Sequence, residues 1–291
     1  DLGSATRHRT LYFPMLLPVA FFWRPRPRPF SRRPKLKVLE VLECGGPGGT
    51  GNQAISICEG LDPARFEAVL IFAARGAPPS AFAARLPERV RAVHVRELVR
   101  EIRPLKDLQA LRRLVALFRA EKPDVVHLHS SKAGVLGRLA AWWTGVPRIY
   151  YSPHGYAFLQ KDRSALTRGF YRAVELSLGW IGEVVAVSPS EAALARPLAW
   201  HRRVHTITDP YLPPPSKPAR APSAGGLLVG SCGRLSAARR PESFVMLAQR
   251  LTDARNGLRC VWIGGGELER AVKRQIEDLS LEGKLALTGW L

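Results

Sequence analysis

The chain has 291 residues, of which 46% are hydrophobic and 23% are charged. These values are typical of a folded globular protein and exclude a disordered, collagen-like or polytopic membrane chain. The length predicts one large domain or two ordinary ones. The formal net charge of +20 favours an anionic partner such as nucleic acid, phospholipid headgroups or phosphorylated metabolites, without choosing among them.

Cysteine usage points to a reducing compartment. The four cysteines, Cys44, Cys58, Cys232 and Cys260, are scattered and form no C-x-x-C pair. The spacing therefore indicates neither a disulfide framework nor a zinc site, and a cytosolic protein fits best.

Residues 1–33 form an N-terminal tail in which an apolar stretch, Leu11 to Trp23, precedes alternating arginine and proline. The stretch is too short to span a bilayer as a helix, and its charges follow it, unlike those of a secretory signal. Two interpretations stay open. The tail is either an interfacial anchor on anionic lipid, or an unstructured tail or a mis-assigned start.

From Lys35 onward, short apolar runs alternate with helical patterns, the order typical of parallel βαβ units. We therefore expect a doubly wound α/β domain over residues 34–208. The predicted strands are Val38 to Leu42, Phe66 to Phe72, Val90 to Val95, Val125 to His129, Arg148 to Ser152 and Glu183 to Val187. The predicted helices are Asn52 to Leu61, Leu105 to Glu121, Ala133 to Thr144, Ala165 to Ile181 and Ser190 to Arg196.

A proline-rich linker is predicted over residues 209–225, followed by a second α/β unit over 226–291. Its predicted strands are Leu227 to Cys232, Leu258 to Ile263 and Lys284 to Thr288, and its helices are Pro241 to Leu251 and Glu267 to Leu279. Such a sheet has an open edge and a half-covered core, so we expect an incomplete domain in a truncated sequence.

A glycine-rich loop, Cys44 to Gly51, is predicted between the first strand and the first helix. Backbone amides at Gly46 and Gly49 could meet a phosphate at the helix N-terminus. The loop lacks both the Lys-Ser/Thr pair of a P-loop and the spacing of the dinucleotide fingerprint. A tight strand-to-helix turn is the alternative.

Two histidines, His129 and His154, and a lysine are predicted at the carboxyl edge of this sheet, where open α/β folds bind ligands. His127 and His129 share a strand face and could in principle bind metal, but no carboxylate or cysteine lies nearby in the sequence, so none is predicted. We expect His127 to be a packed histidine with a satisfied ring. Lys132 follows at a helix start, and His154 lies on a loop suited to hydrogen bonding or proton transfer, if not to a plain turn.

Arginines follow the first strand of the second unit, from Arg234 to Arg240. Guanidinium forks at Arg234 and Arg239 match phosphate oxygens and could neutralise a diphosphate without a metal. A solvated basic turn is the alternative.

Several segments, in this order, resemble the GT-B fold glycosyltransferases of family 4, which are retaining enzymes that use nucleoside-diphosphate sugars. The resemblance covers Lys35 to Leu291. The motif sequences are most similar to those of members that build bacterial capsule, exopolysaccharide or O-antigen chains on lipid-linked acceptors. The segments are Val38 to Gly46, Lys122 to Arg138, Ser152 to Phe158, Val185 to Ser188, Gly233 to Leu235 and Ile263 to Glu267.

The resemblance implies two Rossmann-like domains facing a cleft, the second incomplete, and it implies roles for individual residues. His154 would lie beside the transferred sugar as the catalytic residue, and Gly46 and Gly49 would approach the donor phosphates. Arg234 would bind the diphosphate, together with Arg239 where the family usually has lysine. On the acceptor side the candidates are His129 and Lys132. The family's Glu-x7-Glu segment would lie beyond Leu291, and Asp209-Pro210 replaces its usual Asn-Gly.

The implied reaction transfers a sugar, with retention, from a nucleotide sugar to a lipid-linked glycan in cell-surface polysaccharide synthesis. Neither a cofactor nor a metal is expected, and the implied location is cytoplasmic, peripheral to the anionic inner face of the membrane. Nucleic acid is not an expected partner, because no recognised nucleic-acid-binding pattern occurs. Two alternatives stay open: a nucleotide-sugar 2-epimerase of the same architecture, and an inactive truncated remnant or basic binding module.

Overall fold

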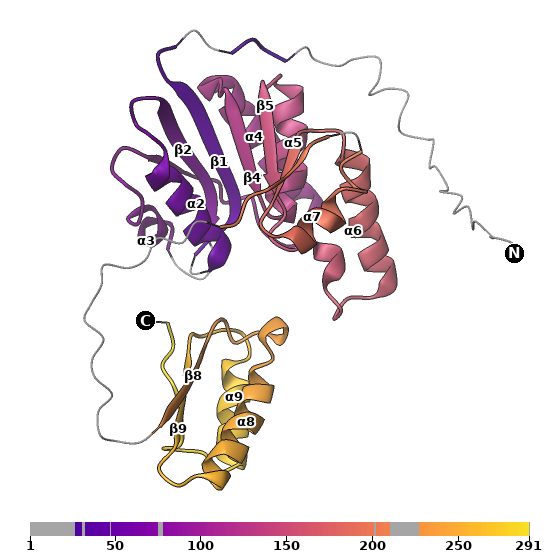
Figure 1. Ribbon diagram of the computed structural model, residues 1–291. Coiled ribbons are helices and arrows are strands. Elements are labelled where there is room, and N and C mark those ends of the chain that lie inside the picture. The colour runs from indigo at the N-terminus through magenta and orange to yellow at the C-terminus, as the bar shows by residue number, and fades with distance from the viewer. Residues whose placement is uncertain are drawn as a thin grey trace, which may run out of the picture. The chain divides into compact units, whose positions relative to one another are not determined.

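A computed structural model describes residues 27–30, 33–46, 48–74, 78–200, 202–209 and 227–290. The chain divides into two compact units, Asp1–Leu212 and Pro213–Leu291 (Figure 1). Most of the predicted N-terminal tail and nearly all of the predicted linker lie outside the described residues. Within the described part of the chain, no helix combines the length and the apolar character needed to cross a bilayer.

The first unit contains a seven-stranded parallel sheet in the order β3-β2-β1-β4-β5-β6-β7. The strands are β1 (Leu36–Gly45), β2 (Phe66–Ala74), β3 (Arg91–His94), β4 (Val125–His129), β5 (Arg148–Ser152), β6 (Glu183–Ala186) and β7 (Val204–Thr206). The helices are α2 (Gly49–Gly60), α3 (Pro79–Ala83), α4 (Pro104–Glu121), α5 (Ser131–Trp143), α6 (Ala165–Leu178) and α7 (Pro189–Ala195), with a 3₁₀ turn at Ala157–Leu159. The strand order reverses between β1 and β4, which makes this point the topological switch of a doubly wound fold.

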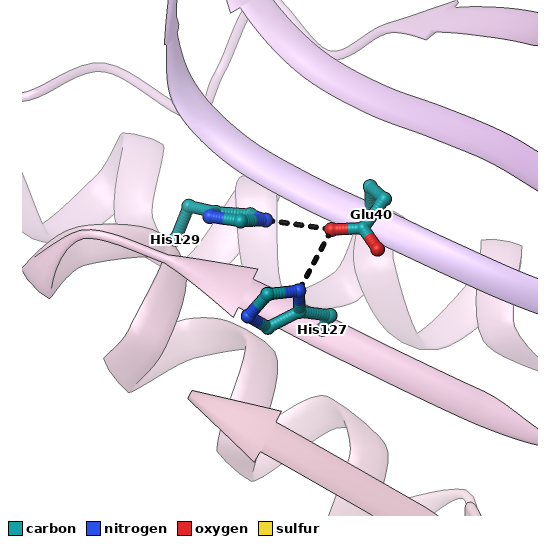
Figure 2. Close-up of side chains that lie close together, drawn as sticks. All are labelled: Glu40, His127 and His129. Carbon is teal, nitrogen blue, oxygen red and sulfur yellow. Dashed lines mark hydrogen bonds and ion pairs between the residues drawn. The ribbon is translucent and has the colours of Figure 1, made fainter. Parts of the chain in front are cut away.

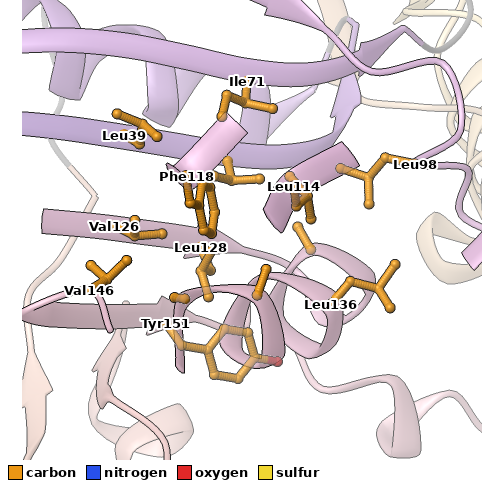
Figure 3. Packing of buried hydrophobic residues seen from close by; sticks show 14 of the residues in the cluster. Leu39, Ile71, Leu98, Leu114, Phe118, Val126, Leu128, Leu136, Val146 and Tyr151 are labelled. Carbon is orange, nitrogen blue, oxygen red and sulfur yellow. The ribbon is translucent and has the colours of Figure 1, made fainter. Parts of the chain in front are cut away.

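Both faces of the sheet are buried near its centre. Leu39 of β1 and Leu128 of β4 belong to one apolar cluster, which α4 covers with Leu114 and Phe118 (Figure 3). Leu42 of β1 faces the other way, into a second cluster with residues of α2, β2 and α3. Successive side chains point to opposite faces, and two-sided burial explains why these strands are nearly continuous apolar runs. The predicted α/β class is therefore confirmed.

The second unit is smaller and has a three-stranded parallel sheet in the order β10-β9-β8. Its elements are β8 (Leu228–Cys232), a 3₁₀ turn (Ala237–Arg239), α8 (Pro241–Ala254), β9 (Arg259–Ile263), α9 (Glu269–Asp278) and β10 (Leu285–Leu287). Val245 of α8, Trp262 of β9 and Ile276 of α9 are buried together in its core.

The glycine-rich segment differs from the prediction. The first strand extends to Gly45 and α2 already begins at Gly49, whereas a loop was predicted up to Gly51. A Cβ on Gly51 would lie only 2.9 Å from the carbonyl oxygen of Gly46 and 3.2 Å from the ring of Phe82. Glycine at this position therefore permits close packing inside a helix. Two short elements, α3 and β7, were not predicted, because five and three residues show too little periodicity.

Two helical glycines give a matched test of the packing around β5. A Cβ on Gly134 of α5 would overlap the ring of Tyr151, whereas a Cβ on Gly169 of α6 would meet no atom within 4 Å. We expect Gly134→Ala to lower the free energy of unfolding by about 1–3 kcal/mol. Gly169→Ala should raise it by roughly 0.5–1 kcal/mol, because alanine favours the helix. Urea unfolding measures both, and a neutral Gly134→Ala would contradict the packing.

Candidate functional site

A buried carboxylate, Glu40, lies in the middle of β1 beside two histidines of β4. Glu40 is paired with His127 in the sheet register, and only 1% of it is exposed. Its Oε2 lies 3.0 Å from His127 Nδ1 and 2.6 Å from His129 Nε2. Dashed lines mark both contacts in Figure 2. All three side chains point away from the Leu39–Leu128 cluster, because strand residues alternate between faces. Glu40 was not predicted from the sequence, because it lies far along the chain from His127 and His129, yet it supplies a carboxylate to both.

The charge of Glu40 determines where the protons of its neighbours lie. Burial alone raises the pKa of Glu40, but attraction and hydrogen bonds from His127 and His129 outweigh burial and lower it. An ionised carboxylate only accepts, so His127 Nδ1 and His129 Nε2 both donate to it. His127 Nε2 then accepts a hydrogen bond from Ser152 Oγ at 2.9 Å. Both ring nitrogens of His127 are paired, which confirms the prediction of a packed histidine.

His129 connects this carboxylate to His154. Its Nδ1 lies 2.9 Å from His154 Nε2. Burial and the neighbouring His127 lower the pKa of His129, so its ring stays neutral and Nδ1 accepts the proton of His154 Nε2. Burial, with His129 and His127, also lowers the pKa of His154, to about 3. His154 is partly exposed, and its Nδ1 has no hydrogen-bond partner among the residues that the structure describes.

A second buried carboxylate fixes the loop that carries His154. The backbone is left-handed at His154, with φ 52°, and at Gly155, with φ 85°. Glu191 of α7 accepts a hydrogen bond from the amide of Gly155 at 2.7 Å through Oε1, and one from the amide of Val187 at 2.9 Å through Oε2. The imidazole is therefore held on two sides, at its ring by His129 and at its backbone by Glu191.

The two residues predicted on the acceptor side, Lys132 and His129, are less accessible than expected. Lys132 is buried, and its Nζ donates to Asp107 Oδ1 at 2.6 Å and to the carbonyl oxygen of Glu101 at 2.9 Å. The ammonium thus ties the start of α5 to α4. His129 is fully buried. The acceptor-side roles of Lys132 and His129 stay predictions, and a direct contact would need Lys132 to leave Asp107.

The amide-rich start of α2 lies just beyond the carboxyl end of β1. The first intrahelical hydrogen bond runs from the amide of Asn52 to the carbonyl oxygen of Gly48, at 3.1 Å. The amides from Gly49 to Gly51 precede it, have no partner within the helix, and share the first turn with no acidic residue. Donors of this kind attract anions. The roles of Gly46 and Gly49 toward a donor phosphate nonetheless stay predictions.

Another titratable group lies at the same edge. Glu43 is buried and accepts a hydrogen bond from the amide of Ala133 at 2.8 Å. Burial raises the pKa of Glu43 to about 7, although the amide of Ala133 and the charges of Arg100 and Lys132 oppose the shift.

Glu40, His127 and His129 also form a donor set of the kind that holds a divalent metal. Two ligand atoms of one tetrahedral zinc ion lie roughly 3.3 Å apart, given bonds of about 2.0–2.1 Å. The observed separations from Glu40 Oε2, 3.0 Å and 2.6 Å, are shorter and fit hydrogen bonds instead. The geometry favours a hydrogen-bond network, and the prediction that no metal is required stays a prediction.

In the second unit, Arg234 and Arg239 follow the carboxyl end of β8. This loop packs against the glycine loop after β9, where Leu235 donates its amide to the carbonyl oxygen of Gly265 at 3.0 Å. A Cβ on Gly266 would overlap the carbonyl oxygen of Leu235 and lie 2.9 Å from the side chain of Arg234, so glycine is needed for this approach. Arg239 is exposed. The diphosphate-binding role of the two arginines stays a prediction.

The low pKa of His154 has a consequence for stability. Because the folded state resists protonation of His154 down to about pH 3, the unfolded state binds a proton first as the pH falls below about 6.5. The free energy of unfolding should therefore decrease between about pH 6.5 and 3. His154→Asn should reduce this slope by about 1 kcal/mol per pH unit. Urea unfolding at several pH values measures both slopes, and equal slopes for wild type and His154→Asn would contradict the shift.

Comparison with known proteins places the chain in a family. The family model "Glycosyl transferase 4-like domain" matches residues 48–210, more than half of the chain. A curated relative, the UDP-Gal:alpha-D-GlcNAc-diphosphoundecaprenol alpha-1,3-galactosyltransferase of Escherichia coli, is 44% identical over 81 residues, which are 28% of this chain and 21% of that protein. The capsular polysaccharide biosynthesis glycosyltransferase CapM of Staphylococcus aureus is 29% identical over 102 residues, covering 33% and 25%. The matched stretches thus span a quarter or less of either relative.

Solved structures show the fold. The Anabaena protein HepE, in complex with UDP and glucose, has a TM-score of 0.64 and 18% identity, over 88% of this chain and 70% of that one. A UDP-N-acetylglucosamine 2-epimerase is similar with a TM-score of 0.56 and 15% identity, over 88% and 69%. These similarities confirm the predicted GT-B fold. The family match over residues 48–210 shows that the chain belongs to the glycosyl transferase 4-like family.

Proposed function

We propose that the full-length protein transfers a sugar, with retention, from a nucleoside-diphosphate sugar to a lipid-linked saccharide in cell-surface polysaccharide synthesis. The observation that carries this proposal is that a neutral, partly exposed His154 and the amide-rich start of α2 both follow carboxyl ends of strands at one edge of the sheet, where the switch point lies. Ligands of open α/β sheets bind at this edge. The family match and the E. coli relative, whose name includes a UDP-sugar and a diphosphoundecaprenol acceptor, support the same reaction.

In this proposal the two groups have different tasks. The amides from Gly49 to Gly51 face the phosphates, because they are donors at the positive end of a helix dipole. His154 faces the sugar, since a neutral imidazole with a free nitrogen suits a hydroxyl. Arg234 and Arg239 neutralise the departing diphosphate, and no metal or cofactor is required for that.

A 2-epimerase is the second candidate, because an epimerase shares the fold. Product analysis separates the two. An epimerase releases an isomerised sugar nucleotide without any acceptor, whereas a transferase releases nucleoside diphosphate in proportion to the glycosylated acceptor. The curated relatives favour transfer.

The test is a donor screen on the full-length protein that measures nucleoside-diphosphate release. We expect His154→Ala to lower kcat/KM by about 100-fold or more, through lost positioning at the reacting sugar. Arg234→Ala should raise the donor KM about tenfold or more, because a charge-assisted hydrogen bond is lost.

Matched controls are His94→Ala for the histidine and Arg250→Ala for the arginine, since both positions are exposed and lie on other elements. The controls should keep wild-type kinetics. Wild-type turnover in His154→Ala and Arg234→Ala would refute the site.

The acceptor side of the proposal includes an anionic membrane surface, and α6 is the described element that suits it. Leu166 is 87% exposed and Phe170 is 55% exposed, on one side of the helix. Exposed arginines at 168 and 172 lie about 200° round the helix from this apolar stripe, on its opposite side, because successive residues are about 100° apart. The helix's single acidic residue, Glu175, is buried in an ion pair with Arg138 at 2.7 Å. An apolar face opposite a basic face, without exposed acidic groups, is typical of helices at anionic lipid interfaces.

Vesicle co-sedimentation tests this surface. Leu166→Glu/Phe170→Glu should weaken binding to phosphatidylglycerol vesicles about tenfold or more, because apolar contact is lost and two negative charges are added. Met246→Glu/Leu247→Glu makes the same change at exposed apolar positions of α8 and should have little effect. Equal binding by both variants, or equal binding of wild type to phosphatidylcholine vesicles, would contradict the proposed surface.

A further inference from the structure

We propose that Glu40 is a positioning residue for His154, acting through His129 so that the imidazole keeps its proton on Nε2 and presents Nδ1 as a hydrogen-bond acceptor. Glu40 lies inside the sheet and has no route to a ligand except this chain of contacts, since only 1% of it is exposed. The link to catalysis rests on the function proposed above, but the proton arrangement does not.

The proton arrangement follows from the order of donors and acceptors. The carboxylate accepts from His129 Nε2 at 2.6 Å, which leaves His129 Nδ1 without a proton in the neutral ring. That nitrogen lies 2.9 Å from His154 Nε2 and can only accept, so the proton between the two rings belongs to His154. The tautomer of a histidine is set by the hydrogen bond that its other nitrogen makes. His154 Nδ1 is therefore a lone pair.

This arrangement restricts what His154 can contact. A lone pair on a neutral ring attracts a hydroxyl or amide donor, and it repels the oxygens of a phosphate, which only accept. The same chain also fixes the ring's orientation, because the left-handed backbone at His154 and Gly155 would otherwise leave the side chain held only through Glu191. By fixing this lone pair, Glu40 and His129 favour the binding of a sugar hydroxyl at His154 Nδ1 over the binding of a phosphate oxygen.

A branch of the network provides an internal control. His127 also donates to Glu40, at 3.0 Å, but its other nitrogen pairs with Ser152 and not with His154. Removing His127 breaks one bond to the carboxylate and leaves the path to His154 intact. Removing Glu40 breaks the path itself.

The test is the tautomer of His154, measured by long-range ¹H–¹⁵N correlation spectra of the full-length protein labelled at histidine, without any ligand. Wild type should show at least about a tenfold excess of the Nε2-protonated form, since a hydrogen bond to a charged group is worth about 1.5–3 kcal/mol. Glu40→Leu should reduce that excess about tenfold, Glu40→Gln should restore part of it with one acceptor oxygen, and His127→Phe should leave it unchanged.

Failure of this inference can be distinguished from failure of the proposed function. An Nδ1-protonated His154 in wild type overturns the inference even if no variant folds, and so does an unchanged tautomer in Glu40→Leu. In turnover assays, Glu40→Leu should lower kcat about 10- to 100-fold with little change in the donor KM, as for residues that orient a working group. If the spectra behave as expected but wild type transfers no sugar, the positioning role stands and the proposed function fails.

Discussion

The candidate site depends on one buried negative charge. Glu40 lies where an isolated carboxylate would be costly, and it stays ionised because two histidines of the neighbouring strand donate hydrogen bonds to it. That single charge orders a series of proton positions through His129 to His154. The network therefore transmits a constraint from the inside of the sheet to its carboxyl edge, where His154 lies.

The fold makes this arrangement possible. Reversal of strand order between β1 and β4 brings Glu40 and His127 into register, and the alternation of side chains places both on the face opposite the main apolar cluster. The next strand, β5, ends beside β4 and delivers His154 two residues later. A doubly wound sheet thus assembles a polar chain from three strands while the other face stays apolar.

The sequence predicted some of these features well and others not at all. The bounds of β4 and β5 were predicted correctly, because each is a short apolar run between turn residues. The start of α2 was wrong, because glycines that permit close packing look like a loop. Glu40 was missed because its partners are distant in the chain. An acidic residue inside an apolar strand was the available sign that a buried partner exists. The roles of Gly46 and Arg234 depend on contacts with a ligand. Neither the sequence pattern nor the backbone structure determines such contacts.

The most direct measurement is a crystal structure of the full-length protein with a nucleotide sugar. A sugar hydroxyl should lie within hydrogen-bond distance of His154 Nδ1, with the phosphates toward the start of α2. Phosphate oxygens facing Nδ1, or a ligand bound away from the β1–β4 edge, would contradict the role given to the buried carboxylate.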